Sequence, residues 1–203
     1  MNQMQHDFVG GPVAQDFGDV LGTPFKVFLS NGVQTKVDDA GKVMTEIDDL
    51  PGLIVSVVQE RALHPRKLSG YDLKFFRTAL CKRSNEIAET LDLTPEHYSR
   101  CETGSKTLSS STEKFYRMYS FLEAGCKHKL LHETPPAELN PEEAKEAIEA
   151  FKKVFLDMKI QHIYSVGEEL EFRFIRRSRA NQCCEPSGDD DGKWRNEDKL
   201  KAA

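Results

Sequence analysis

Four polar side chains lie close together near the middle of the chain: Glu96, His97, Ser99 and Arg100. They offer a carboxylate acceptor, an imidazole that donates or accepts, a hydroxyl and a guanidinium fork. Groups of this kind hydrogen-bond to the edges of base pairs, and an arginine can make two parallel bonds to O6 and N7 of guanine. They act together only if the local structure turns them all outward.

The stretch from Ser84 to Leu93 predicts a short helix followed by a tight turn. Its apolar residues recur at helical spacing, which is typical of a helix with one buried face: Ile87, Ala88 and Leu91. Asp92 then breaks the run, and aspartate tolerates the left-handed conformation that a sharp turn needs.

A second helix is predicted directly after the turn. Thr94 is a good N-cap, Pro95 suits the first helical position, and Gly104 can end the helix. Tyr98 and Cys101 fall on its core side, so the four polar side chains fall on or near the opposite side. Two short helices in this order form a helix-turn-helix arrangement.

These residues resemble the XRE class of helix-turn-helix proteins, the lambda repressor and Cro type. The features that carry the resemblance are Ala88, the turn at Asp92-Leu93, Thr94-Pro95-Glu96 and the run Ser99-Arg100-Cys101-Glu102-Thr103-Gly104. Leu68-Ser69-Gly70-Tyr71-Asp72-Leu73 followed by Arg77 is similar to the DNA-binding half of MqsA-type antitoxins. The resemblance spans roughly residues 50 to 122.

The resemblance implies a homodimer that binds a palindromic operator in double-stranded DNA, with its recognition helices in major grooves about 34 Å apart. The expected base contacts are Glu96, His97, Ser99 and Arg100. The expected phosphate contacts are Lys82, Arg83, Ser84, Asn85, Thr94, Ser105 and Lys106. By the same resemblance, Arg77 pairs with Glu102 and ties the first helix of the bundle to the recognition helix.

The chain departs from the family pattern at several points. Ser84, Asp92 and Cys101 stand where the family usually has Gln, Gly and Trp. No cysteine precedes Cys81, so the zinc-binding domain of MqsA-type antitoxins has no counterpart here. Two other roles stay open: an antitoxin that masks a cognate toxin by direct contact, and an adaptor that kept the shape but lost DNA binding.

Charge is unevenly distributed along the chain. Its 203 residues include 28 basic and 33 acidic side chains, for a net charge of −5. Between Arg66 and Lys129, however, twelve basic side chains face eight acidic ones. The basic excess therefore falls on the segment that would approach phosphate.

No catalytic motif and no cofactor site are predicted. The chain lacks a glycine-rich phosphate loop, a nucleophile elbow and a useful cluster of His, Asp and Glu. Cys126, His128 and His132 have a spacing that suits a metal. No fourth ligand is evident and the stretch lies at a predicted helix end, so a solvated basic terminus is favoured over a metal site.

The flanking segments predict an α+β fold. Residues 1–22 are expected to form a flexible arm. In 23–65, alternating residues from Phe25 to Ile47 predict a three-stranded antiparallel meander, covered by a helix over Leu53–Leu63. This unit is interpreted as a folding platform or dimerisation surface, with a ligand- or partner-sensing module as the alternative.

The helix-turn-helix bundle is expected to span 66–132. Its first helix has Ser69 as N-cap and Asp72 at the capping-box position. Its closing helix carries an apolar stripe that predicts a core face: Phe115, Met118, Tyr119 and Leu122.

The C-terminal part predicts a helix followed by strands over 137–176, as an element for dimerisation or partner binding. Leu170, Phe172 and Phe174 alternate with charged residues, as in a half-buried strand. A polar tail over 177–203 is expected to be disordered.

Location is predicted from what the chain lacks. No apolar run is long enough to cross a bilayer, and no signal peptide is evident at the N-terminus. The five cysteines are odd in number and lack paired spacing. These features favour a reduced, cytoplasmic setting. The DNA binding that the resemblance implies places the expected location at the nucleoid.

Overall fold

The computed structural model describes residues 15–37, 41, 43–131, 149, 151–162, 169–176 and 193–201. Helices and strands both contribute, which confirms the predicted α+β class. The N-terminal elements are α1 (Gly18–Leu21), β1 (Lys26–Ser30), β2 (Val33–Val37), β3 (Val43–Ile47) and α2 (Leu50–Leu63). The elements that follow are α3 (Gly70–Ala79), α4 (Ser84–Thr90), α5 (Pro95–Glu102), α6 (Ser110–Leu131), β4 (Glu171–Arg176), β5 (Trp194–Asn196) and α8 (Glu197–Lys201).

The three N-terminal strands do not form the predicted meander. β1 pairs in parallel with β4, which pairs antiparallel with β5, while β2 and β3 form a separate hairpin. Asn31 and Gly32 do turn the chain with positive φ angles, as their sequence indicates. The meander was wrong because β1 pairs with a distant strand, in which the buried Phe172 and Phe174 lie opposite Val27 and Leu29.

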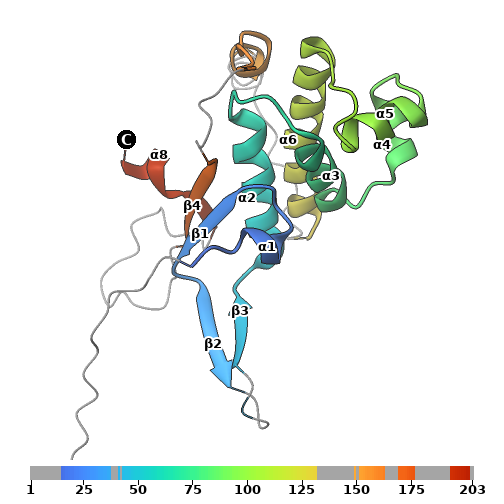
Figure 1. Ribbon diagram of the computed structural model, residues 1–203. Helices are drawn as coiled ribbons and strands as arrows, with labels where there is room; N and C mark the ends of the chain where they lie inside the picture. Colours follow the sequence, from blue (N-terminus) through green and yellow to red (C-terminus); the bar gives the residue numbers. More distant parts are fainter. Residues whose placement is uncertain are drawn as a thin grey trace, which may run out of the picture.

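Helix α2 stands between the small sheet and the other helices (Figure 1). Asp49 caps it by accepting a hydrogen bond from the Gly52 backbone N–H at 3.1 Å. Its buried apolar side chains belong to one hydrophobic core that extends from Phe25 to Trp194. By contrast, the β2–β3 hairpin projects from this body (Figure 1).

The buried face of α6 differs from the predicted one. Phe115 and Leu122 are exposed, so the expected stripe is wrong for them, whereas the partly buried Tyr119 does pack against the core. The buried positions are displaced by about one residue along the helix: Glu113, Tyr116, Arg117, Ser120 and Ala124. Two of them, Glu113 and Arg117, are charged. The prediction failed because it assigned charged residues to solvent, whereas these are paired in the interior.

Both ends of the described chain are more ordered than predicted. At the N-terminal end, Phe17 is buried and the Asp16 carboxylate accepts hydrogen bonds from the backbone N–H groups of Gly18 and Val27. At the C-terminal end, Trp194 is buried within β5. The flexible arm is therefore wrong for residues 16–22, and the disordered tail is wrong for 194–201. Residues 1–14 and 177–192 lie outside the described part.

The C-terminal helix and strand pack on the rest of the chain. Within the helical residues 151–156, the rings of Phe151 and Phe155 contact Phe121 of α6, with centroids 6.4 Å and 5.6 Å away. The alternation in β4 is confirmed, because Phe172 and Phe174 are buried and Arg173 is not. Earlier in the segment predicted to contain strands, Gln161 makes an isolated bridge to Arg66, and 163–168 lie outside the described residues.

Among the described helices, none combines the length and the apolar character needed to cross a membrane.

Candidate nucleic-acid interface

Helices α4 and α5 are joined by the tight turn that the sequence predicts. Asp92 has a φ of 52°, in the left-handed region, and the Leu93 N–H donates to the Ala88 carbonyl at 2.9 Å. Thr94 then caps α5, because its hydroxyl accepts a hydrogen bond from the His97 N–H at 3.2 Å. The local chemistry of the sequence therefore sets where α5 begins.

The inner face of α5 is fixed by two buried side chains, Tyr98 and Cys101. The Tyr98 and Tyr116 hydroxyls lie 3.2 Å apart, and the Tyr116 hydroxyl donates to the Leu73 carbonyl at 3.2 Å. Burial raises the pKa of both phenols and of the Cys101 thiol, so all three stay protonated at neutral pH. The rotation of α5 about its own axis is set by this neutral contact.

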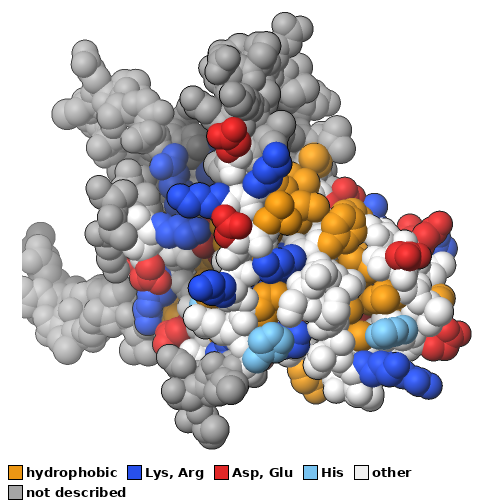
Figure 2. All heavy atoms as spheres, turned by 90° about the horizontal axis from the view of Figure 1, so that it is seen from above, with side chains coloured by type: hydrophobic (Ala, Val, Ile, Leu, Met, Phe, Trp, Pro, Cys, Tyr) orange, Lys and Arg blue, Asp and Glu red, His pale blue; other side chains and the backbone are white. Residues whose placement is uncertain are grey.

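The outer face of α5 carries the predicted base contacts toward solvent. Glu96, Ser99 and Arg100 are exposed, and His97 is partly exposed. Basic, acidic and histidine side chains are intermixed at the edge of the molecule where α4 and α5 lie (Figure 2). This surface therefore carries hydrogen-bonding groups of both positive and negative charge and is not a purely basic patch.

An ion pair ties the end of α5 to α3. The Arg77 Nε lies 2.7 Å from Glu102 Oε1, and both side chains are largely buried. The hydrogen bond to Glu102 raises the pKa of Arg77. Arg77 also donates to the Lys82 carbonyl at 3.3 Å, so the same guanidinium holds the turn before α4.

Close backbone contact adds to this attachment. A Cβ on Gly70, at the start of α3, would lie 2.3 Å from the Glu102 carbonyl oxygen and 2.7 Å from that of Cys101. Only a glycine allows α3 and α5 to approach this closely. The angle of α5 is therefore determined by α3.

The predicted phosphate contacts fall into two groups. Before α4, Lys82 pairs with Glu123 at 3.0 Å, and that hydrogen bond raises the pKa of Lys82. Arg83 pairs with Glu86 at 3.2 Å. Both cations must exchange a carboxylate for a phosphate if they are to contact DNA.

The remaining predicted phosphate contacts lie at helix ends. Ser84 and Asn85 occupy the first turn of α4, and Asn85 is exposed. After α5, the Ser105 hydroxyl lies 3.2 Å from that of Thr103, and the exposed Lys106 donates its backbone N–H to Arg100. Thr94 is engaged as the cap of α5.

Sequence reasoning missed a buried ionic network behind this surface. Arg61 binds Asp72 through two hydrogen bonds, of 2.8 Å and 3.0 Å. Arg117 binds Glu113 at 2.8 Å, and Glu113 also pairs with Lys67 at 2.9 Å. The spacing of Glu113 and Arg117 by four residues was the available signal, but nothing in the sequence shows that the pair is buried.

The structure describes only part of the stretch at Cys126 that was considered as a metal site. Cys126 is exposed, and the side chains of His128 and His132 lie outside the described residues. Within the described residues, no three His, Cys, Asp or Glu side chains gather where they could hold a metal ion.

Comparison with protein-family models, with curated proteins and with solved structures finds no match for this chain.

Proposed function

We propose that this protein is a sequence-specific regulator of transcription that binds double-stranded DNA through α5, in the manner of the XRE class it resembles. One observation carries the proposal. The outer face of α5 presents Arg100, Ser99 and Glu96 to solvent, while Tyr98 and Cys101 hold its inner face. A helix that is capped, rigidly backed and polar outside can enter the major groove.

In this proposal each exposed side chain has a distinct task. Arg100 makes two hydrogen bonds to a guanine, and Glu96 accepts one from a cytosine amino group. His97 and Ser99 donate or accept at neighbouring positions. Because Glu96 repels phosphate, α5 gains little by lying on the backbone and gains most when seated in the groove.

The proposed assembly is a homodimer on a palindromic operator, with a second α5 about 34 Å away. Binding at the promoter of its own gene would block the polymerase, which makes the proposed regulator an autoregulatory repressor. Its proposed place is the cytoplasm, at the nucleoid.

The test is fluorescence anisotropy with a labelled duplex from the gene's own upstream region and a shuffled duplex of equal length. Arg100→Ala is expected to lose about 1–3 kcal/mol on the upstream duplex and little on the shuffled one. Lys106→Ala is expected to weaken both duplexes alike, because a phosphate contact carries no sequence information. Arg173→Ala, on β4, is the matched control and should bind as the unmodified protein does.

Two results would overturn the proposal. The first is an equal loss on both duplexes for Arg100→Ala, which would remove base reading from α5. The second is binding to neither duplex at low salt, where phosphate attraction is strongest.

A second candidate function is the binding of a partner protein, such as the cognate toxin of an antitoxin. Exposed apolar side chains on α6 and on residues 151–156 favour it: Phe115, Leu122, Val154 and Leu156. Hydrophobic side chains gather on the face shown in Figure 2. Patches of this kind mark interaction sites. Co-purification of a neighbouring gene product, lost in Leu122→Glu, would support this function; a monomer that co-purifies with nothing would exclude it.

A further inference from the structure

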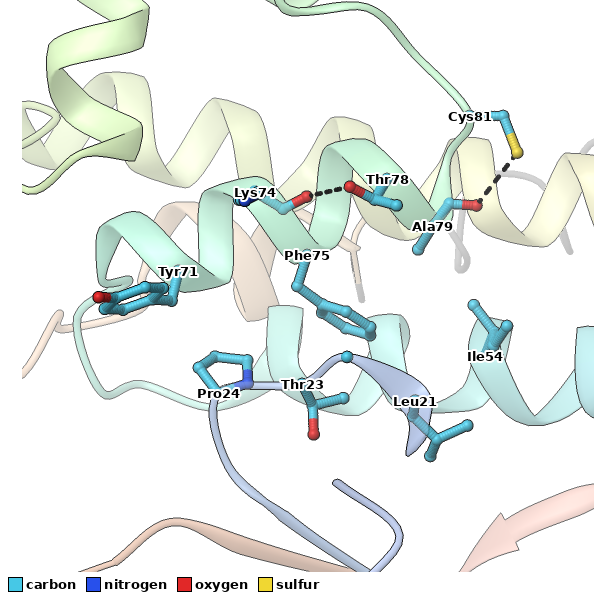
Figure 3. A pocket seen from close by; sticks show the side chains of 11 residues that line it. Leu21, Thr23, Pro24, Ile54, Tyr71, Lys74, Phe75, Thr78, Ala79 and Cys81 are labelled. Atoms are coloured by element: carbon cyan, nitrogen blue, oxygen red, sulfur yellow. Dashed lines mark hydrogen bonds between the residues drawn. The ribbon is translucent and has the colours of Figure 1, made fainter. Parts of the chain in front are cut away.

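A pocket of about 540 Å³ lies between α3, α2 and the segment that follows α1 (Figure 3). Pockets of roughly 300–1,000 Å³ suit small organic molecules. None of the side chains proposed to contact DNA lines this pocket. It is therefore a separate site that the proposed function does not use.

The floor of the pocket is apolar. Leu21, Pro24 and Ile54 line it from the N-terminal segment and α2, and Phe75 lines it from α3. Phe75 is held in place because its ring packs edge-on against Phe25, with the centroids 5.9 Å apart. A ligand with an apolar body would displace water from a rigid hydrocarbon surface here.

The rim on the α3 side is polar. Tyr71, Lys74 and Thr78 follow one another at helical spacing along α3, and all three are exposed. Lys74 is the only charged side chain among the residues that line the pocket. Asp72, on the same helix, is not among the residues that line the pocket, and its carboxylate pairs with the buried Arg61.

We propose that this pocket binds a small organic anion whose apolar body rests on Phe75 and Ile54 and whose anionic group pairs with Lys74. The apolar floor selects the body, and the single ammonium selects the sign of the charge.

The position of the pocket gives its occupant a means of regulating α5. Tyr71, Lys74 and Thr78 lie on one side of α3, whereas Gly70 and Arg77 hold α5 from another side. A ligand that shifts α3 changes the presentation of α5. This regulatory consequence rests on the proposed DNA binding, but the ligand site itself does not.

Two dyes of matched shape test the site on the full chain. The first is the fluorescent anion 8-anilinonaphthalene-1-sulfonate, and the second is its uncharged counterpart N-phenyl-1-naphthylamine. Both should bind with an increase in emission. Lys74→Ala should weaken the sulfonate about two- to fivefold, as for an exposed ion pair, and leave the uncharged dye unaffected. Thr78→Phe, which adds a ring at the rim, should weaken both dyes.

Lys152→Ala is the matched control, because Lys152 is exposed and does not line the pocket. Emission from Trp194, the only tryptophan in the chain, reports whether each variant is folded. Binding of neither dye overturns the site, as does binding that a folded Thr78→Phe variant leaves unchanged. Equal effects of Lys74→Ala on the two dyes overturn the anionic class.

A final measurement separates the site from its regulatory consequence. The affinity of the chain for its upstream duplex is compared with and without saturating sulfonate dye. An unchanged DNA affinity with the dye bound removes the coupling and leaves the site. If no DNA binds at all, the dye measurements still decide whether the site exists.

Discussion

At the scale of single residues, Arg117 is fully buried although a guanidinium is costly to remove from water. It is stabilised because each of its three guanidinium nitrogens donates a hydrogen bond to an acceptor. One is the Glu113 carboxylate, and the others are backbone carbonyls at the end of α2 and beyond it: Arg61, Ala62, His64 and Arg66. Two of these carbonyls, those of Arg61 and Ala62, belong to the last turn of α2, where a helix leaves acceptors without partners in the helix.

Replacing Arg117 with methionine should destabilise the fold by about 3–5 kcal/mol. The substitution leaves the buried Glu113 with less compensation and removes the donor to the Ala62 and His64 carbonyls. Urea unfolding followed by Trp194 emission measures the loss. Arg83→Met, at an exposed arginine that also pairs with a glutamate, is the control and should change stability by no more than about 0.5 kcal/mol. Similar losses for the two variants would contradict this account.

His64 makes stability depend on pH. Burial, with the nearby charges of Arg61, Arg117 and Arg66, lowers the pKa of His64 from 6.5 to about 4. Its Nδ1 accepts a hydrogen bond from the Arg66 N–H, which requires the unprotonated nitrogen. The unfolded chain binds the proton more readily, so this contribution is complete above pH 6.5 and is lost as the pH falls toward 4.

Unfolding should therefore become easier between pH 6.5 and 4, and His64→Asn should reduce that dependence because asparagine keeps an acceptor without titrating. Urea midpoints measured at several pH values give the comparison. An identical pH profile in the variant would assign the dependence to other groups.

At the scale of elements, α5 has the orientation that α3 allows. The Arg77–Glu102 pair and the contact at Gly70 join the two helices near the end of α5. The turn at Asp92 and the cap at Thr94 fix only where α5 begins. Local sequence therefore defines the helix, and packing on α3 determines the direction in which its polar face points.

Gly70→Ala should destabilise the protein by about 1–3 kcal/mol, because the added Cβ meets backbone oxygens that cannot move independently. Gly125→Ala, in α6, is the matched control. There the Cβ lies 3.2 Å from the flexible end of Gln59, and alanine favours a helix by roughly 1 kcal/mol over glycine. Thermal unfolding by circular dichroism compares the two. Equal effects would show that α3 can move away from α5.

At the scale of the whole molecule, Trp194 of β5 packs beside Gly32 and Asp48, the two residues that flank the β2–β3 hairpin. Trp194 is buried, and its indole N–H donates to the Asp48 carbonyl at 3.0 Å. The ring also packs on Gly32, where a Cβ would lie 3.0 Å from it. Residues more than 140 positions apart in the sequence are thus brought into contact around the buried indole.

Trp194→Ala should destabilise the chain by about 3–5 kcal/mol, as for other buried aromatic residues. Trp194→Phe should lose less, because it keeps most of the apolar contact and gives up one hydrogen bond. Circular dichroism follows unfolding, since both variants lack the fluorescent probe. Full stability in the alanine variant would mean that β5 contributes nothing to the fold.

The sequence by itself determined the local features of this protein. The left-handed turn at Asp92, the caps at Ser69 and Thr94, the buried Tyr98 and Cys101 and the alternation in β4 all follow from properties of neighbouring residues. Backbone sterics, capping and periodicity act over a few residues, so they can be read without knowledge of the fold.

Only the tertiary structure decided what β1 pairs with, which face of α6 is buried and where the pocket on α3 lies. The partner of β1 is more than 140 residues away in sequence, and α6 buries Glu113 and Arg117 because Lys67 and the end of α2 meet them there. Strand pairing and helix burial depend on which charged and apolar side chains contact each other in the fold. The free energy of burying a side chain is therefore set by partners that are distant in sequence rather than by its own segment.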